Sequence, residues 1–149
     1  MKILHVITDC DLQHGGPPIN LINLVKKQNK IGYLSHIATT HSKLNNYKSK
    51  YFLKVKKFIY SFKTNFPKSI NYSKDFKNFI DNNINKYDIL HIHGLYRFPV
   101  SYAAYKSRKL KIPYIIRPHG SLDPFLHNKS NNNLLLKKTW RNLIDYPNL

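Results

Sequence analysis

The stretch KILHVITDCDLQHGGPPINLINLVKKQNKIGYLSHIATT, Lys2–Thr40, decides the fold. Its first part, Lys2–Thr8, is a short apolar run typical of a strand buried on both faces of a parallel sheet. A polar loop follows and ends in GGPP at residues 15–18, and proline is favoured in the first turn of a helix. The apolar residues after it predict a helix that ends near Gly32 and a second strand over Tyr33–Thr40.

The same alternation of strand and helix continues along the chain. The patterns predict strands at Asp88–Gly94 (DILHIHG) and Ile112–Arg117 (IPYIIR), helices at Ser73–Asn83 and Phe98–Leu110, and a last basic helix from Leu134 to about Tyr146. Ser73 is a fair N-cap for its helix. This order predicts an α/β fold, a Rossmann-like doubly wound parallel sheet, as one domain over residues 1–149.

Residues 44–62 carry apolar side chains at helical spacing with lysines largely between them. The stripe consists of Leu44, Tyr47, Tyr51, Val55, Phe58 and Phe62. It predicts an amphipathic helix, for which two interpretations stay open. The helix lies on an anionic membrane, with Lys50, Lys54 and Lys57 as contacts, or its apolar side packs on the sheet and its lysines are solvated.

The composition limits the chemistry. The chain has 25 Lys and Arg against 7 acids, a net charge of +18, which attracts phosphates, nucleic acid and anionic lipid. No glutamate occurs, which excludes a catalytic glutamate for this chain acting alone. Cys10 is the single cysteine, so neither an intrachain disulfide nor a cysteine-based zinc site can form. With no signal peptide and no long apolar run, we expect a cytoplasmic protein, soluble or held at a membrane surface.

Three polar segments with histidine and glycine lie at or just after predicted strands: His14–Gly16, His91–Gly94 and His119-Gly120. In a parallel sheet, ligands bind at the carboxyl ends of the strands. The backbone N–H groups of the first segment face an anion or belong to a plain turn between strand and helix, and we expect His93 to line a cleft. His119 is placed to hydrogen-bond a hydroxyl or a developing charge, or it caps the backbone of its own loop.

Other roles are open for Arg117 and Asp123, and two other kinds of site, for a metal ion or for a nicotinamide cofactor, are alternatives. Arg117 pairs with a phosphate or with Asp123, which otherwise caps the helix that follows. His91, His93 and His119 could bind zinc or iron, but we favour a packed His91 and a cleft-lining His93, and expect no metal. A nicotinamide site is disfavoured because its spaced glycines and its acid are missing.

Five segments, in this order, resemble the N-terminal domain of group 1 (family 4) glycosyltransferases of the GT-B fold. They are MKILHV (1–6), GGP (15–17), DILHIHG (88–94), IPY (112–114) and, above all, RPHGSLDP (117–124). Lys137-Lys138 and the WRNL at 140–143 also look like the helix that follows in this family. The resemblance spans nearly the whole chain and implies one half of a GT-B fold.

The resemblance implies retaining transfer of a sugar from a nucleotide-sugar to an acceptor hydroxyl, without metal or other cofactor. The N-terminal domain of this family mostly shapes the acceptor side, and family habit suggests cell-surface polysaccharide or lipopolysaccharide synthesis with a glycan or lipid-linked acceptor. By the resemblance, Gly15 and Gly16 approach the donor diphosphate and His119 contacts the transferring sugar as the catalytic residue. The expected cleft residues are His93, Gly94, Arg117, Gly120 and Asp123.

One departure from the family concerns the donor side. Complete members hold the donor with two glutamates in a second domain, and this chain has no glutamate. We therefore expect a truncated fragment without the donor-binding domain, inactive alone; a separately encoded second half is the less favoured alternative. A lipid-linked acceptor would bring this domain into peripheral contact with the inner face of the membrane. The alternative is a non-enzymatic basic module that binds anionic membrane or nucleic acid, although no nucleic-acid motif occurs and nucleic acid is not the expected partner.

Overall fold

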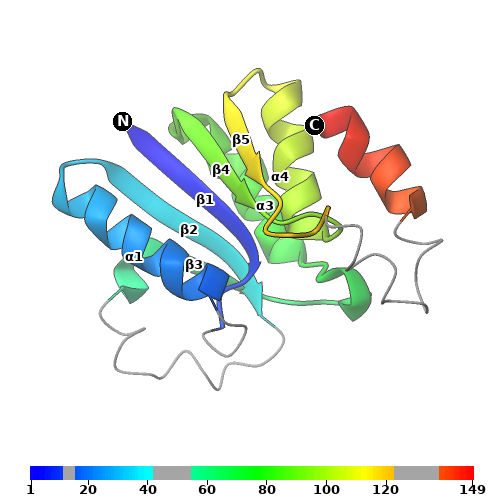
Figure 1. The fold of residues 1–149 in the computed structure, drawn as a ribbon, viewed down its shortest axis with the longest axis horizontal. Helices are drawn as coiled ribbons and strands as arrows, with labels where there is room; N and C mark the ends of the chain where they lie inside the picture. Colours follow the sequence, from blue (N-terminus) through cyan, green and yellow to red (C-terminus); the bar gives the residue numbers. More distant parts are fainter. Residues whose placement is uncertain (12–15, 42–54, 123–137) are drawn as a thin grey trace.

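The structure, a computed structural model, describes residues 1–11, 16–41, 55–122 and 138–149. In these residues five strands form one sheet in the order β3-β2-β1-β4-β5, and every neighbouring pair is parallel (Figure 1). The strands are β1 (Lys2–Asp9), β2 (Leu34–His41), β3 (Ile59–Lys63), β4 (Ile89–His93) and β5 (Tyr114–Arg117). Because the strand order reverses on either side of β1, the sheet is doubly wound, which confirms the predicted fold class.

Helices cover both faces of this sheet. Helix α1 (Gly16–Lys30) lies on one face, and α3 (Lys74–Asn83) and α4 (Phe98–Lys109) lie on the other (Figure 1). The face under α1 buries Ile7 and Ile37 against the helix. The opposite face buries the larger cluster, which consists of Leu4, Val6, Leu90 and Ile92 from the sheet, Phe76 and Ile80 from α3, and Val100, Ala103 and Ala104 from α4.

The helix boundaries follow local signals in the sequence. Helix α1 begins at Gly16, directly before two prolines, and the chain turns after it at Gly32, whose φ of 94° favours glycine. Helix α3 begins after Ser73, whose Oγ accepts a hydrogen bond from the Phe76 N–H at 3.2 Å. Both helices confirm the predictions made from those residues.

The predicted helix over the 44–62 stripe is wrong where the structure describes it. Residues 42–54, with Lys50 and Lys54, lie outside the described part. Residues Lys56–Phe58 form a short 3₁₀ turn (η3), and the next five residues form β3, which pairs with β2. The apolar residues serve two faces instead of one, because Phe58 packs on the α1 side and Phe62 on the α3 side.

Because Lys57 lies in a short turn and not on an amphipathic helix, the helix argument for a membrane contact of this residue no longer holds. This residue is exposed in η3, and its ammonium lies 5.0 Å from the centre of the Phe58 ring. Among the helices that the structure describes, none is long and apolar enough to cross a bilayer.

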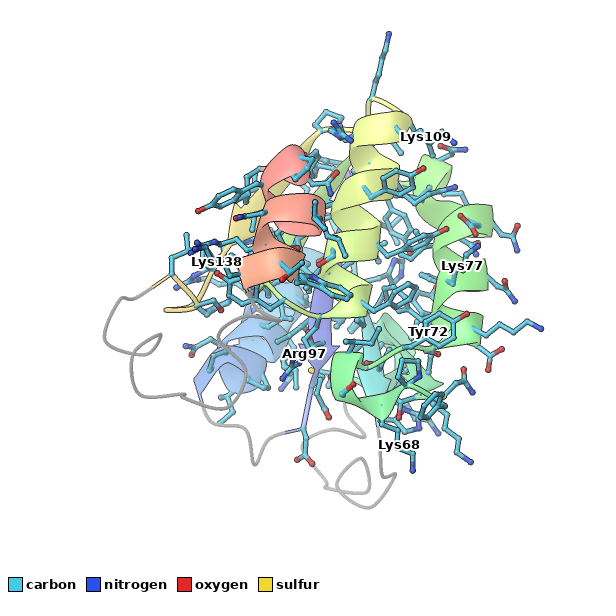
Figure 2. The ribbon with its side chains drawn as sticks, turned by 90° about the vertical axis from the view of Figure 1, so that its right-hand side faces the viewer. Lys68, Tyr72, Lys77, Arg97, Lys109 and Lys138 are labelled. Atoms are coloured by element: carbon cyan, nitrogen blue, oxygen red, sulfur yellow. The ribbon has the colours of Figure 1, made fainter. Side chains whose placement is uncertain are left out.

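The chain ends in a helical segment beside α4. In place of the regular helix predicted to about Tyr146, the described residues form a helical turn at 138–140, a π-helix at Arg141–Asp145 (η6) and a 3₁₀ turn at Tyr146–Asn148 (η7). The Asp145 carboxylate accepts hydrogen bonds from Ser101 Oγ at 2.5 Å and from the Tyr96 N–H at 3.0 Å. These bonds hold the segment against α4, on the side opposite α3 (Figure 2).

We expect replacement of Phe76 by alanine to destabilise the protein by about 3–5 kcal/mol, because it leaves a large cavity between the sheet and α3. The Phe76 ring is fully buried. Urea unfolding followed by circular dichroism would give the loss as a lower midpoint at unchanged slope. The control is Leu143→Ala, since Leu143 is 72% exposed and its truncation should change stability by less than about 0.5 kcal/mol. Equal effects of both substitutions would contradict the described core.

Candidate functional site

A cavity of about 470 Å³ lies at the carboxyl edge of the sheet. Four segments that are distant in sequence line it. They are Ile7–Asp9 at the end of β1, Pro17 and Pro18 in the first turn of α1, His93 and Gly94 at the end of β4, and the turn after β5 with Pro118, His119 and Ser121. The side chain of Asn71 adds to the rim. This is the place where doubly wound sheets bind ligands, since the strand order reverses between β1 and β4.

The structure brings together several residues that the sequence singles out. His93, Gly94 and His119 share the cavity with Pro17 and Pro18 of α1, and Gly16 directly precedes these prolines without lining the cavity itself. Gly15 and Asp123 lie outside the described residues, so the pairing of Arg117 with Asp123 is not described. Arg117 is exposed at the end of β5, in register with His93.

The turn after β5 presents His119 in an unusual backbone conformation. His119 has a φ of 51° and Gly120 a φ of 81°, and the Ser121 N–H donates to the Pro118 carbonyl at 3.0 Å. Two successive positive φ angles are typical of a type I′ turn. Glycine adopts such an angle freely, whereas a side chain of the size of histidine does so at a cost of about 1–3 kcal/mol. The position of His119 therefore depends on contacts that hold its ring.

Those contacts come from a row of three imidazoles that runs from the core to the cavity. Nδ1 of His5 lies 3.1 Å from Nε2 of His93, and Nδ1 of His93 lies 3.0 Å from Nε2 of His119. His5 and His93 lie on the same face of the sheet, because β1 pairs in register with β4 as His5 with His91. The exposed His119 is thus attached to two buried histidines.

Burial keeps this row neutral. Burial is the main reason why the pKa of His5 falls to about 4 and that of His93 to about 2; neighbouring histidines lower both further. The pKa of His119 is also lowered, by partial burial and by the positive charge of Arg117. At neutral pH the row consists of uncharged imidazoles, which can accept and donate hydrogen bonds at a ligand.

Two residues of the site, His5 and Asp9, were not predicted from the sequence. His5 stands inside an apolar strand, and only the register of β1 with β4 reveals its contact with His93. Asp9 lines the cavity and its carboxylate accepts a bond from the Asp11 N–H at 2.9 Å. The only available signal for both was a polar side chain interrupting an otherwise apolar strand.

The histidines also give the described residues one group that could hold a metal ion. It consists of His5, His91 and His93, whose ligand atoms lie within 4.8 Å of one another. The group differs from the one considered from sequence, because His5 takes the place of His119. Two facing nitrogens of this group already bond to each other. Burial lowers the pKa of both His91 and His93, and the positive charge of Arg117, which lowers both further, would repel a cation. His91 itself is only half-buried, whereas the sequence analysis favoured a packed core residue.

We expect the protein to lose stability as the pH falls from about 7.5 to 5. The unfolded chain protonates its histidines near pH 6.5, while folded His5 and His93 stay neutral to about pH 4 and 2, so the unfolded state binds more protons. Each buried imidazole then lowers the free energy of unfolding at pH 5 by up to about 2 kcal/mol. Urea midpoints measured across this range would show the loss.

The matched variant for this measurement is His93→Gln, which replaces one titrating ring by a neutral amide that can still donate and accept hydrogen bonds. Its stability should fall less steeply with acid than that of the unchanged protein, and the difference isolates His93 from all other titrating groups. Identical pH dependence of the two proteins would contradict the neutral, buried state of His93.

Comparison with known proteins assigns the chain to a family. None of the curated proteins compared with the chain matches it. The family model of Glycosyltransferase Family 4 matches residues 14–146, well over half of the chain. The matched residues include the start of α1, the end of β4 and the turn after β5, three of the four segments around the cavity. The chain therefore belongs to Glycosyltransferase Family 4.

Proposed function

We propose that this domain is the acceptor-side half of a retaining, metal-independent glycosyltransferase that moves a sugar from a nucleotide-sugar to an acceptor hydroxyl. The observation that carries the proposal is the shared cavity of the α1 start and His119. An anion site and a hydrogen-bonding imidazole at one cavity match the two ends of a sugar diphosphate. Membership of the family supports sugar transfer as the reaction class.

The anion end of the proposed site depends on few donors. In the first turn of a helix the backbone N–H groups have no helical acceptor, but Pro17 and Pro18 have no N–H. The remaining donors of this turn are the N–H groups of Gly16 and Ile19. They lie at the positive end of the helix dipole, where negative charge is stabilised.

These donors would act on the charge that develops during transfer. As the glycosidic bond to the diphosphate breaks, the leaving group gains negative charge, and donors aimed at it stabilise the transition state more than the bound substrate. His119 would contact the transferring sugar, and His93, Gly94 and Gly120 would shape the cleft beside it. Arg117, exposed at the carboxyl end of β5, would add positive charge on the same edge of the sheet.

The acceptor belongs to the same proposal. We place the reaction in cell-surface polysaccharide or lipopolysaccharide synthesis, with a glycan or lipid-linked acceptor at the inner face of the membrane. The net charge of +18 supports a contact with anionic lipid at that surface. A lipid-linked acceptor would then reach the cavity without a membrane-spanning helix in the described part of the chain.

We expect Gly16→Ala to weaken the binding of pyrophosphate about fivefold, because the added methyl group obstructs the approach of an anion to the backbone. The substitution should leave the fold intact, since, of the residues that the structure describes, a Cβ at Gly16 would come within 4 Å of the Asn20 side chain alone, at 3.9 Å. Amide chemical shifts in ¹⁵N-labelled protein, followed during titration with pyrophosphate, would measure both properties.

In the unchanged protein the shifts should concentrate at Gly16, Ile19, Gly94 and Ser121, around the cavity. Leu24→Ala, on the same helix but away from the cavity, should leave the affinity unchanged. Shifts confined to other parts of the surface would overturn the anion site.

We expect the 149-residue chain alone to release nucleoside diphosphate from UDP-, GDP- and ADP-activated hexoses only at the background rate. The glutamate pair that holds the donor in this family has no counterpart in a chain without glutamate. Clear turnover by the chain alone would contradict this prediction. Fusion to the donor-binding half of a characterised family member should restore release, and His119→Ala should reduce it again by about 10²-fold.

A further inference from the structure

The imidazole row is anchored at its buried end by helix α1. Oε1 of Gln28 accepts a hydrogen bond from Ser35 Oγ at 2.7 Å and lies 2.9 Å from Nε2 of His5. From there the row continues through His93 to His119 at the cavity. One unbroken series of hydrogen bonds therefore joins the core under α1 to the residue placed at the sugar.

The anchor sets the direction of every bond in the series. An amide oxygen can only accept, so Nε2 of His5 carries the hydrogen and donates to Gln28. A neutral imidazole has one N–H, so Nδ1 of His5 is an acceptor and Nε2 of His93 donates to it. By the same rule Nδ1 of His93 accepts, and Nε2 of His119 donates. Nδ1 of His119 is then the nitrogen without a hydrogen.

At neutral pH the surroundings of His5 and His93 prevent either ring from taking up a second hydrogen. His5 is 0% exposed and His93 is 4% exposed. A proton added to either ring would lie in a poorly solvated site, and the neighbouring His91 opposes more positive charge at both rings, as does Arg117 at His93. Each ring of the series therefore carries one hydrogen on its nitrogens, and Gln28 decides the direction in which the hydrogen bonds run.

We propose that Gln28, His5 and His93 are positioning residues that hold His119 in its Nε2–H tautomer, with Nδ1 left as a hydrogen-bond acceptor at the cavity. The group that meets His119 must then donate a hydrogen, as a hydroxyl does. A fully ionised phosphate oxygen cannot. The start of α1 and His119 therefore differ in chemistry, with the N–H groups of Gly16 and Ile19, on either side of the cavity-lining Pro17 and Pro18, for an anion and an acceptor at His119 for a hydroxyl.

The inference that this hydroxyl belongs to a sugar rests on the proposed function, but the tautomer of His119 does not. Long-range ¹H–¹⁵N correlation spectra of the 149-residue chain near neutral pH identify the protonated nitrogen of each histidine without any ligand. We expect His5, His93 and His119 all to be Nε2–H tautomers. Nδ1–H forms, or a rapid exchange of both forms at His119, would overturn the proposal.

Two substitutions of Gln28 test whether the anchor acts at a distance. Gln28→Leu removes the acceptor, and the two nitrogen shifts of His119 should move toward a common averaged value. Gln28→Glu keeps an acceptor and should preserve the Nε2–H pattern at all three rings. If His119 keeps its pattern in a folded Gln28→Leu protein, Gln28 has no positioning role.

His36 is the internal control in every spectrum. Its Nδ1 lies 3.2 Å from the Tyr87 hydroxyl, and it lines a different cavity. Its shifts should stay constant in both variants, which separates a change along the row from a general loss of structure. Should Gln28→Leu fail to fold, the tautomers of the unchanged protein and of Gln28→Glu still decide the question. A failed pyrophosphate titration with intact tautomers would count against the function alone.

Discussion

The site depends on the parallel pairing of β1 with strands on both of its sides. This pairing makes β1 the centre of the sheet and reverses the strand order between β1 and β4. The carboxyl ends of β1, β4 and β5 then meet the start of α1 at one edge, where a cavity remains. The register of the same pairing sets His5 diagonally beside His93. The backbone ladders of β1, β4 and β5 thus place the strand ends that contribute residues to the site.

The buried imidazoles are polar groups in a core whose two main clusters are apolar. Isolated polar groups in such a core are costly, and a polar row is tolerated where each member has a partner. Here the bonds run from Ser35 and Gln28 through His5 and His93 to an exposed ring, so the row ends at the cavity. The same bonds hold His119 in a left-handed backbone conformation that its side chain disfavours. The packing under α1 and the position of His119 at the cavity are thus properties of one connected structure.

Local patterns predicted the elements whose signals are local. The Ser73 cap, the stop at Gly32 and the apolar runs of β1 and β4 depend on neighbours a few residues away, and the structure has them as predicted. The 44–62 stripe failed because β2 offered an open edge, and pairing with that edge outweighed the helical spacing for residues 59–63. The π-helical end near Asp145 likewise depends on a contact with Ser101, which no local pattern contains.

The sequence by itself determined the fold class, the family, and the glycine and histidine segments that surround the cavity. Strand periodicity and turn residues act over short distances, so they can be read along the chain. Only the tertiary structure decided that Gln28 and His5 join His93 and His119 in one hydrogen-bonded row. It also decided that His5, and not His119, lies with His91 and His93 in the group that could hold a metal ion. Those contacts join residues 23 to 88 positions apart, and they depend on strand register and on the placement of α1 over the sheet.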